Sequence, residues 1–158
     1  MIEEFLTAKG EKLSKDKLIS EIVDFIKSND SFTYRILVGT DSEYFLNSKA
    51  DFVSVIVVHR IGEGARYFWR REIISKKFSL GERLWQEAIL SINISQELLK
   101  VLTNLNLNLE FEIHLDLGIN GKSSSSLKEI INLVRGYGFE IKIKPQSYAA
   151  SKIADRLI

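Results

Sequence analysis

The spacing of hydrophobic and polar residues changes along the chain between a helical period and a strand period. Apolar residues at helical spacing predict a helix from Ser14 to about Ser28, after a loosely attached arm over residues 1–12. Ser14 suits the N-cap because its hydroxyl can accept a bond from the free amides of the first turn. Residues 34–41 then alternate in the manner of a strand, which predicts a buried strand ending at Asp41.

Two more strands are predicted directly after this one. A loop over residues 43–50 leads to the almost wholly apolar run 52–58, which is typical of a strand buried on both faces. Turn residues fill positions 59–64, and residues 66–74 mix charged and aromatic side chains in a way that suits a sheet edge. These three strands predict an antiparallel meander.

The second half of the chain alternates helices with strands. A long helix is predicted over 79–102, a strand over 109–116, and a helix from the serine run to about residue 135. A short strand over 139–144 and a final helix over 148–158 follow. A long helix between two strands indicates a crossover connection.

This element order predicts an α/β fold with a five-stranded mixed sheet of order 3-2-1-4-5, flanked by helices. The fourth strand then lies parallel to the first, at about 4.8 Å. Asp41 and Asp116 stand at the C-terminal ends of these two strands. The chain path diverges between them, and ligand sites of α/β sheets collect at such switch points.

Composition narrows the class of protein. The chain has 158 residues, 45% apolar and 27% charged, which fits one globular domain with a sizeable core. It has no cysteine, no run long enough to span a bilayer and no signal-peptide pattern, so the default expectation is a cytoplasmic protein. Its formal net charge of +1 means that nucleic-acid binding would depend on local clusters of cations.

The paired carboxylates predict a metal site. Asp41 and Asp116 would repel each other at this spacing, and a divalent cation would relieve the repulsion. Mg²⁺ suits them because it binds a few carboxylate oxygens and keeps several waters. Glu87 on the long helix and Asp155 on the final helix are candidates to complete the site.

Three segments carry a family resemblance: VGTDSE (38–43), HLDLGINGKSS (114–124) and KPQSYAASKIAD (144–155). They resemble the bacterial and archaeal YkuK-like family of ribonuclease-H-like proteins, which supplies no assigned reaction. The resemblance implies one ribonuclease-H-like domain over 1–158, with residues 1–30 as an N-terminal arm and helix. It also implies two Mg²⁺ or Mn²⁺ ions held by acidic residues, and the matching positions are Asp41, Glu87, Asp116 and Asp155.

Each candidate ligand also has a structural interpretation. Asp116 can begin the following glycine turn, and Asp155 stands near the chain end, where helices fray. Glu87 can be a solvated residue paired with Arg83 one turn earlier. Glu82 competes with Glu87 as the helical ligand, or instead stabilises the helix N-terminus.

The stretch 116–123 nearly matches the phosphate-binding loop of nucleotide hydrolases, but Asp116 stands where that loop requires glycine. An ATPase is therefore disfavoured. Lys122 and the amides near Ser123 and Ser124 remain candidates to hold one phosphate of a polynucleotide, or are simply an exposed lysine and a helix cap. His114 shares a strand face with Asp116, where it can contact substrate, assist proton transfer or be a hydrogen-bonded structural residue.

A second group of substrate-binding candidates mixes cations with aromatic residues: Arg66, Arg70, Arg71, Lys76 and Lys77 around Tyr67, Phe68 and Trp69. Such a mixture suits phosphates and stacked bases, and equally suits a protected edge strand. Strand alternation divides the cluster between both faces of the sheet.

Two functions are therefore open. The first is a two-metal nuclease that cleaves phosphodiester bonds in RNA, an RNA/DNA hybrid or structured DNA. The second is a non-catalytic module on the same fold that binds nucleic acid or protein. The sequence does not determine the oligomeric state.

Overall fold

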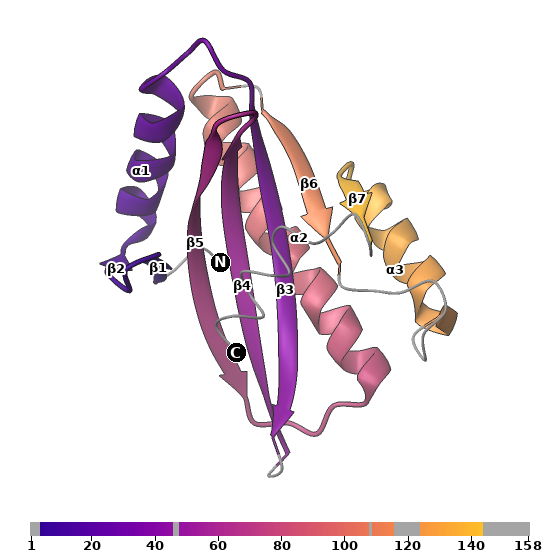
Figure 1. Ribbon diagram of the computed structural model, residues 1–158. Helices are drawn as coiled ribbons and strands as arrows, with labels where there is room; N and C mark the ends of the chain where they lie inside the picture. The colour runs from indigo at the N-terminus through magenta and orange to yellow at the C-terminus, as the bar shows by residue number, and fades with distance from the viewer. Residues whose placement is uncertain (1–3, 46–47, 108, 116–123, 144–158) are drawn as a thin grey trace.

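The computed structural model describes residues 4–45, 48–107, 109–115 and 124–143 (Figure 1). Three helices and seven strands lie in these ranges. The helices are α1 (Lys15–Lys27), α2 (Leu80–Asn104) and α3 (Ser124–Gly136). The strands are β1 (Phe5–Thr7), β2 (Lys12–Leu13), β3 (Tyr34–Phe45), β4 (Lys49–Arg60), β5 (Gly64–Ile74), β6 (Glu110–His114) and β7 (Glu140–Lys142).

The strands form one mixed sheet of order β2-β1-β5-β4-β3-β6-β7. β3, β4 and β5 are antiparallel neighbours, whereas β6 and β7 run parallel to β3. The prediction of five strands in the order 3-2-1-4-5 was therefore wrong for the whole sheet, because β1 and β2 add to it beyond β5. The strands predicted from the sequence are β3 to β7, and they follow one another as β5-β4-β3-β6-β7.

The N-terminal segment is part of the sheet and not the loosely attached arm that was predicted. β1 pairs with β5 through Leu6↔Trp69 and Thr7↔Phe68, and the indole of Trp69 donates to the carbonyl of Thr7 at 3.1 Å. Phe5 is completely buried. β5 is consequently covered by β1 along this stretch instead of forming the sheet edge. A strand of three residues is too short to show the alternation of apolar and polar residues. It can be recognised only from its pairing with β5 in the structure.

The β3–β4 hairpin is longer than the hydrophobic pattern indicates. β3 continues to Phe45, which pairs with Lys49 at the start of β4, so the predicted loop over 43–50 was wrong. Asp41 therefore lies inside β3 and not at its end. Backbone pairing with β4 continues through residues 42–45 although their side chains are polar or exposed.

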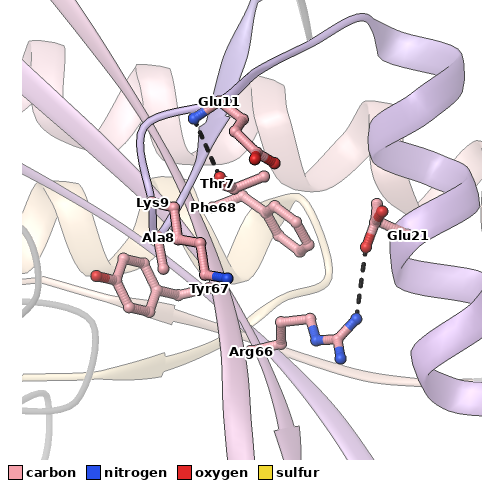
Figure 2. A pocket seen from close by; sticks show the side chains of 8 residues that line it. All are labelled: Thr7, Ala8, Lys9, Glu11, Glu21, Arg66, Tyr67 and Phe68. Carbon is pink, nitrogen blue, oxygen red and sulfur yellow. Dashed lines mark hydrogen bonds and ion pairs between the residues drawn. The ribbon is translucent and has the colours of Figure 1, made fainter.

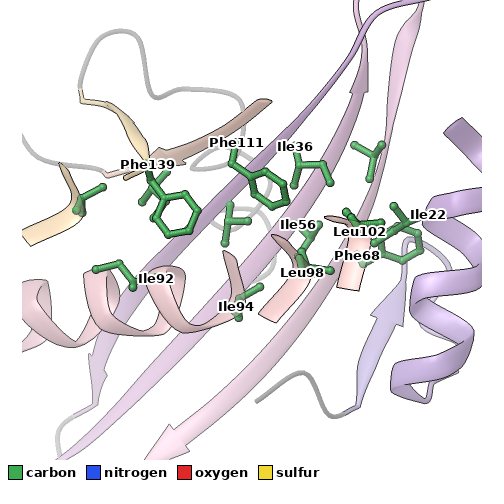
Figure 3. Close-up of a cluster of buried hydrophobic side chains, with 14 of the residues drawn as sticks. Ile22, Ile36, Ile56, Phe68, Ile92, Ile94, Leu98, Leu102, Phe111 and Phe139 are labelled. Atoms are coloured by element: carbon green, nitrogen blue, oxygen red, sulfur yellow. The ribbon is translucent and has the colours of Figure 1, made fainter. Parts of the chain in front are cut away.

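Alternation along β3 separates the two faces of the sheet. Ile36 and Val38 join the main core, together with apolar residues of α1, α2 and α3, and α2 crosses behind β3 and β4 (Figures 1 and 3). Leu37 belongs to a second buried cluster on the opposite face, with Val53, Val55 and Val57 of β4. Asp41 pairs with Val53 and so lies on this second face, whereas its neighbour Ser42 faces α2.

The predicted helix starts are confirmed by their caps. The hydroxyl of Ser14 accepts a hydrogen bond from the amide of Lys17, and that of Ser79 accepts one from the amide of Glu82. Within the described ranges, no helix combines the length and the apolar character needed to cross a membrane.

Burial of Phe5 predicts that the N-terminal strand stabilises the whole domain. Phe5→Ala should lower the free energy of unfolding by about 3–5 kcal/mol, as expected for a truncated core phenylalanine. Urea denaturation of the full chain measures this. Tyr137→Ala is the matched control, because Tyr137 is half exposed and its truncation should change stability by less than about 0.5 kcal/mol. Equal, small effects would show that β1 does not belong to the cooperative core.

Candidate functional site

Ser42 connects two of the predicted metal ligands. Its backbone amide donates to Oδ1 of Asp41 at 2.9 Å, and its hydroxyl donates to Oε1 of Glu87 at 2.5 Å. Asp41 directly precedes Ser42 on β3, and its side chain lies on the opposite face of the sheet. Glu87 comes from α2, and the packing of this helix against the sheet brings it to the hydroxyl of Ser42. The sequence did not single out Ser42.

Glu87 is buried, with 4% of its surface exposed. The interpretation of Glu87 as a solvated residue is therefore wrong. Arg83, its expected partner, donates through Nη1 to the carbonyl and hydroxyl oxygens of Ser42 at 3.3 and 3.4 Å, and its guanidinium lies 5.6 Å from the Tyr44 ring centre. Glu82, the competing candidate, has a half-exposed side chain 3.8 Å from the ammonium of Lys76.

A chain of hydroxyl groups lies on the α2 side of β3, next to the contact of Ser42 with Glu87. The hydroxyl of Thr40 is 2.9 Å from that of Ser54 on β4 and 2.9 Å from that of Ser91 on α2, and all three residues are buried. Polar residues 83, 87, 91 and 95 follow one another at four-residue spacing along α2. This spacing places the four residues on one face of the helix and is the sequence signal for a polar stripe facing the sheet.

A second polar group lies on the opposite face of the sheet, in register with β3. His114 and Glu112 are both 4% exposed, and Nε2 of His114 lies 3.0 Å from Oε2 of Glu112. Nη1 of Arg35 lies 3.4 Å from the other oxygen of Glu112, while Arg35 also donates twice to Glu110. The hydrogen bond to Glu110 raises the pKa of Arg35 above its ordinary value, so this guanidinium stays charged.

Asp51 is a further buried acid that the sequence did not reveal. It lies two residues along β4 from Val53, the register partner of Asp41, and therefore on the same face as Asp41. One of its oxygens is 3.1 Å from Nε of Arg71. Its other oxygen is buried and has no hydrogen-bond partner within the described part of the chain. Asp51 stands directly before the apolar run 52–58, at the start of the strand, whereas the predicted ligands on strands stand at C-terminal strand ends.

The predicted ligand set is only partly described. Asp116, Lys122, Ser123 and Asp155 lie outside the described residues, and Ser124 is the first residue of α3. Among residues 4–45, 48–107, 109–115 and 124–143, no three His, Cys, Asp or Glu side chains gather closely enough to hold a metal ion.

The chemistry of the described donors fits a divalent cation. Asp41 and Glu87 offer carboxylate oxygens near one serine. Oδ1 of Asp51 and Nδ1 of His114, both on the face of Asp41, are buried atoms without a described hydrogen-bond partner. Oxygen and imidazole donors of this kind bind Mg²⁺ or Mn²⁺.

The two arginines predicted to bind substrate already contact acids. Nη2 of Arg70 lies 3.3 Å from Glu72, and Arg71 holds Asp51. The predicted division of the aromatic residues between faces is confirmed, since Phe68 joins the main core and Trp69 packs on the second cluster.

Two surface cavities lie at opposite ends of the long strands. The first, of about 310 Å³, is formed by β1, α1 and β5 near the ion pair of Arg66 with Glu21 (Figure 2). It is distant from Asp41, because Arg66 pairs with Val58 at the other end of β4. The second, of about 410 Å³, lies at the tip of the β3–β4 hairpin and is lined by Tyr44, Phe45, Ser48 and Lys77.

A model of a protein family described as ribonuclease H-like matches residues 17–158, which is most of the chain. The chain belongs to the ribonuclease H-like family. It is also 25% identical to the uncharacterized protein YkuK of Bacillus subtilis (strain 168), over 96% of this chain and 95% of that protein. For a ribonuclease H-like protein, the mixed sheet and the acids on β3 and α2 are the relevant features, because the family name raises the possibility of nuclease activity or nucleic-acid binding.

The hydroxyl chain should stabilise the base of this site. Thr40→Val keeps the side-chain shape but removes the hydroxyl that Ser54 and Ser91 share, so the free energy of unfolding should fall by about 1–3 kcal/mol. Thr33→Val is the control, since Thr33 is exposed. Urea denaturation compares the two variants. If they are equally stable, the buried hydroxyls contribute nothing through Thr40.

Proposed function

We propose that this protein is a divalent-metal-dependent nuclease that cleaves phosphodiester bonds in RNA, an RNA/DNA hybrid or structured DNA. The observation that carries the proposal is the link of Asp41 and Glu87 through Ser42. A buried glutamate on a helix is costly unless it is paired or binds a cation. Its hydrogen bond to the residue that follows Asp41, in a ribonuclease H-like chain, supports a role in binding metal.

Asp41, Glu87, Asp116 and Asp155 would supply the carboxylates for the divalent cations. A bound Mg²⁺ or Mn²⁺ would supply an activated water and would neutralise charge on the phosphate. Ser42 fixes the carboxylate of Glu87 by donating its hydroxyl. Arg83 places a positive charge against Ser42, where it can pair with a phosphate oxygen of the substrate.

The end of the β3–β4 hairpin supports a polynucleotide substrate. Tyr44 and Phe45 are exposed aromatic residues only three and four positions after Asp41, and Lys77 lines the same cavity. Aromatic faces stack on bases and cations bind phosphates. This surface therefore suits the part of a bound nucleic-acid strand that extends beyond Asp41. The contact between Arg83 and the Tyr44 ring connects the hairpin to the site.

The proposal predicts metal-dependent cleavage that needs both acids. Purified protein should cut at least one labelled RNA, hybrid or branched-DNA substrate in Mg²⁺ or Mn²⁺ and not in EDTA. Asp41→Asn and Glu87→Gln should each lower the cleavage rate at least about 100-fold, as expected for loss of a metal ligand. Glu82→Gln, purified in parallel, is the matched control, because Glu82 lies on the surface of the same helix.

Two results would contradict the proposal. Cleavage that persists in Asp41→Asn would place the reaction elsewhere or show a contaminating nuclease. Nucleic-acid or protein binding without cleavage, unchanged by EDTA and by Asp41→Asn, would identify a non-catalytic binding module. Thermal denaturation of each variant shows that a lost activity is not a lost fold.

A further inference from the structure

We infer that Nδ1 of His114 is a ligand of the cation that Asp41 binds, and that Glu112 and Arg35 hold the imidazole in place for this role. This inference rests on the metal site of the proposed function. It adds a nitrogen ligand to a set that consists otherwise of carboxylates.

The register of β3 and β6 places His114 beside Asp41. Gly39 pairs with His114 in the parallel ladder, and Asp41 lies two residues further along β3 on the same face. The α-carbons of such diagonal neighbours are roughly 8 Å apart. Metal–oxygen and metal–nitrogen bonds are about 2.1 Å long, so one cation between an aspartate and a histidine spans this separation. Gly39 has no side chain to stand between them.

The polar contacts of His114 determine which ring nitrogen is available. Nε2 of His114 lies 3.0 Å from Oε2 of Glu112, and because a carboxylate only accepts hydrogen bonds, the ring donates through Nε2. In the neutral ring, Nδ1 then holds a lone pair. Nη1 of Arg35 lies 3.4 Å from the other oxygen of Glu112, so the carboxylate is held from both sides. A histidine that donates one ring N–H to a carboxylate and binds metal through the other nitrogen is a recurrent arrangement.

The surroundings of Nδ1 support a ligand there. The atom is buried in a residue with 4% exposure, and no donor in the described part of the chain bonds to it, including Lys142, its register neighbour on β7. A buried acceptor without a partner is unfavourable in the absence of a ligand. A cation shared with Asp41 would satisfy it.

A nitrogen ligand has a consequence for the choice of metal. Carboxylate and water oxygens suit Mg²⁺, whereas imidazole favours transition metals. The site should therefore bind Mn²⁺ more tightly than Mg²⁺, and this difference should shrink when His114 is replaced.

Electron paramagnetic resonance of Mn²⁺ added to the full chain tests the inference without a substrate. Pulsed spectra of bound Mn²⁺ should contain a coupling to ¹⁴N from an imidazole. The chain has two histidines, which makes the assignment direct. His59→Gln should keep the coupling, because His59 pairs with Arg35, six residues before Asp41 and roughly 20 Å away along the strand. His114→Gln should lose it and weaken Mn²⁺ binding at least about 10-fold.

Glu112→Gln tests the positioning role of Glu112. The variant keeps a hydrogen-bond acceptor of the same shape but removes the charge that fixes the proton on Nε2, so Mn²⁺ affinity should fall about 10- to 100-fold. If His114→Gln does not fold, His59→Gln protein labelled with ¹⁵N-histidine replaces it, because the ¹⁴N coupling must then change to a ¹⁵N coupling.

The outcomes separate this inference from the proposed function. Mn²⁺ that binds and is lost in Asp41→Asn, but shows no nitrogen coupling, would overturn the role of His114 and leave the carboxylate site intact. A nitrogen coupling that persists in His114→Gln would also overturn it. Failure of the wild-type protein to bind Mn²⁺ or Mg²⁺ at all would overturn both.

Discussion

Hydrogen bonding of β3 on both of its edges is the constraint on which the rest of the structure depends. β3 pairs with β4 along its whole length and with β6 over residues 35–39. These two registers place Asp41 opposite Val53 and Gly39 opposite His114. A shift of either register by one residue would move every side chain to the other face, so the arrangement of acids depends on the register as much as on residue type.

The polar groups near Asp41 are expensive to bury, and several of them have a partner that reduces the cost. The hydroxyls of Thr40, Ser54 and Ser91 lie within hydrogen-bond distance of one another in a chain. Ser42 donates a hydrogen bond to Glu87, and Arg35 forms an ion pair with Glu112. A core made only of apolar residues would be simpler to stabilise, since partly satisfied polar networks weaken a fold. Polar residues concentrated on both faces of one strand therefore indicate a site, whereas the remaining core is apolar.

The edge of the sheet beyond β5 could not be predicted from the sequence. The apolar run in β4 and the caps at Ser14 and Ser79 are local signals. They predicted the strand and the two helix starts correctly. β1 and β2 are too short to carry a period, and they form only because β5 and the core offer a partner. The extension of β3 beyond Asp41 has the same origin, since its residues pair with β4 without an apolar pattern of their own.

The sequence by itself determined the α/β class, the pairing of β3 with its neighbours and two of the acids, because periodicity and crossover rules are local or nearly local. Only the tertiary structure decided that Glu87 is buried against Ser42 and that Glu112 holds His114. The contact of α2 with β3 connects residues more than 40 positions apart in the sequence. The pairing of β6 with β3 connects residues on either side of the whole crossover. No period along the chain reports contacts over such separations, because they depend on how the helix and sheet pack in space.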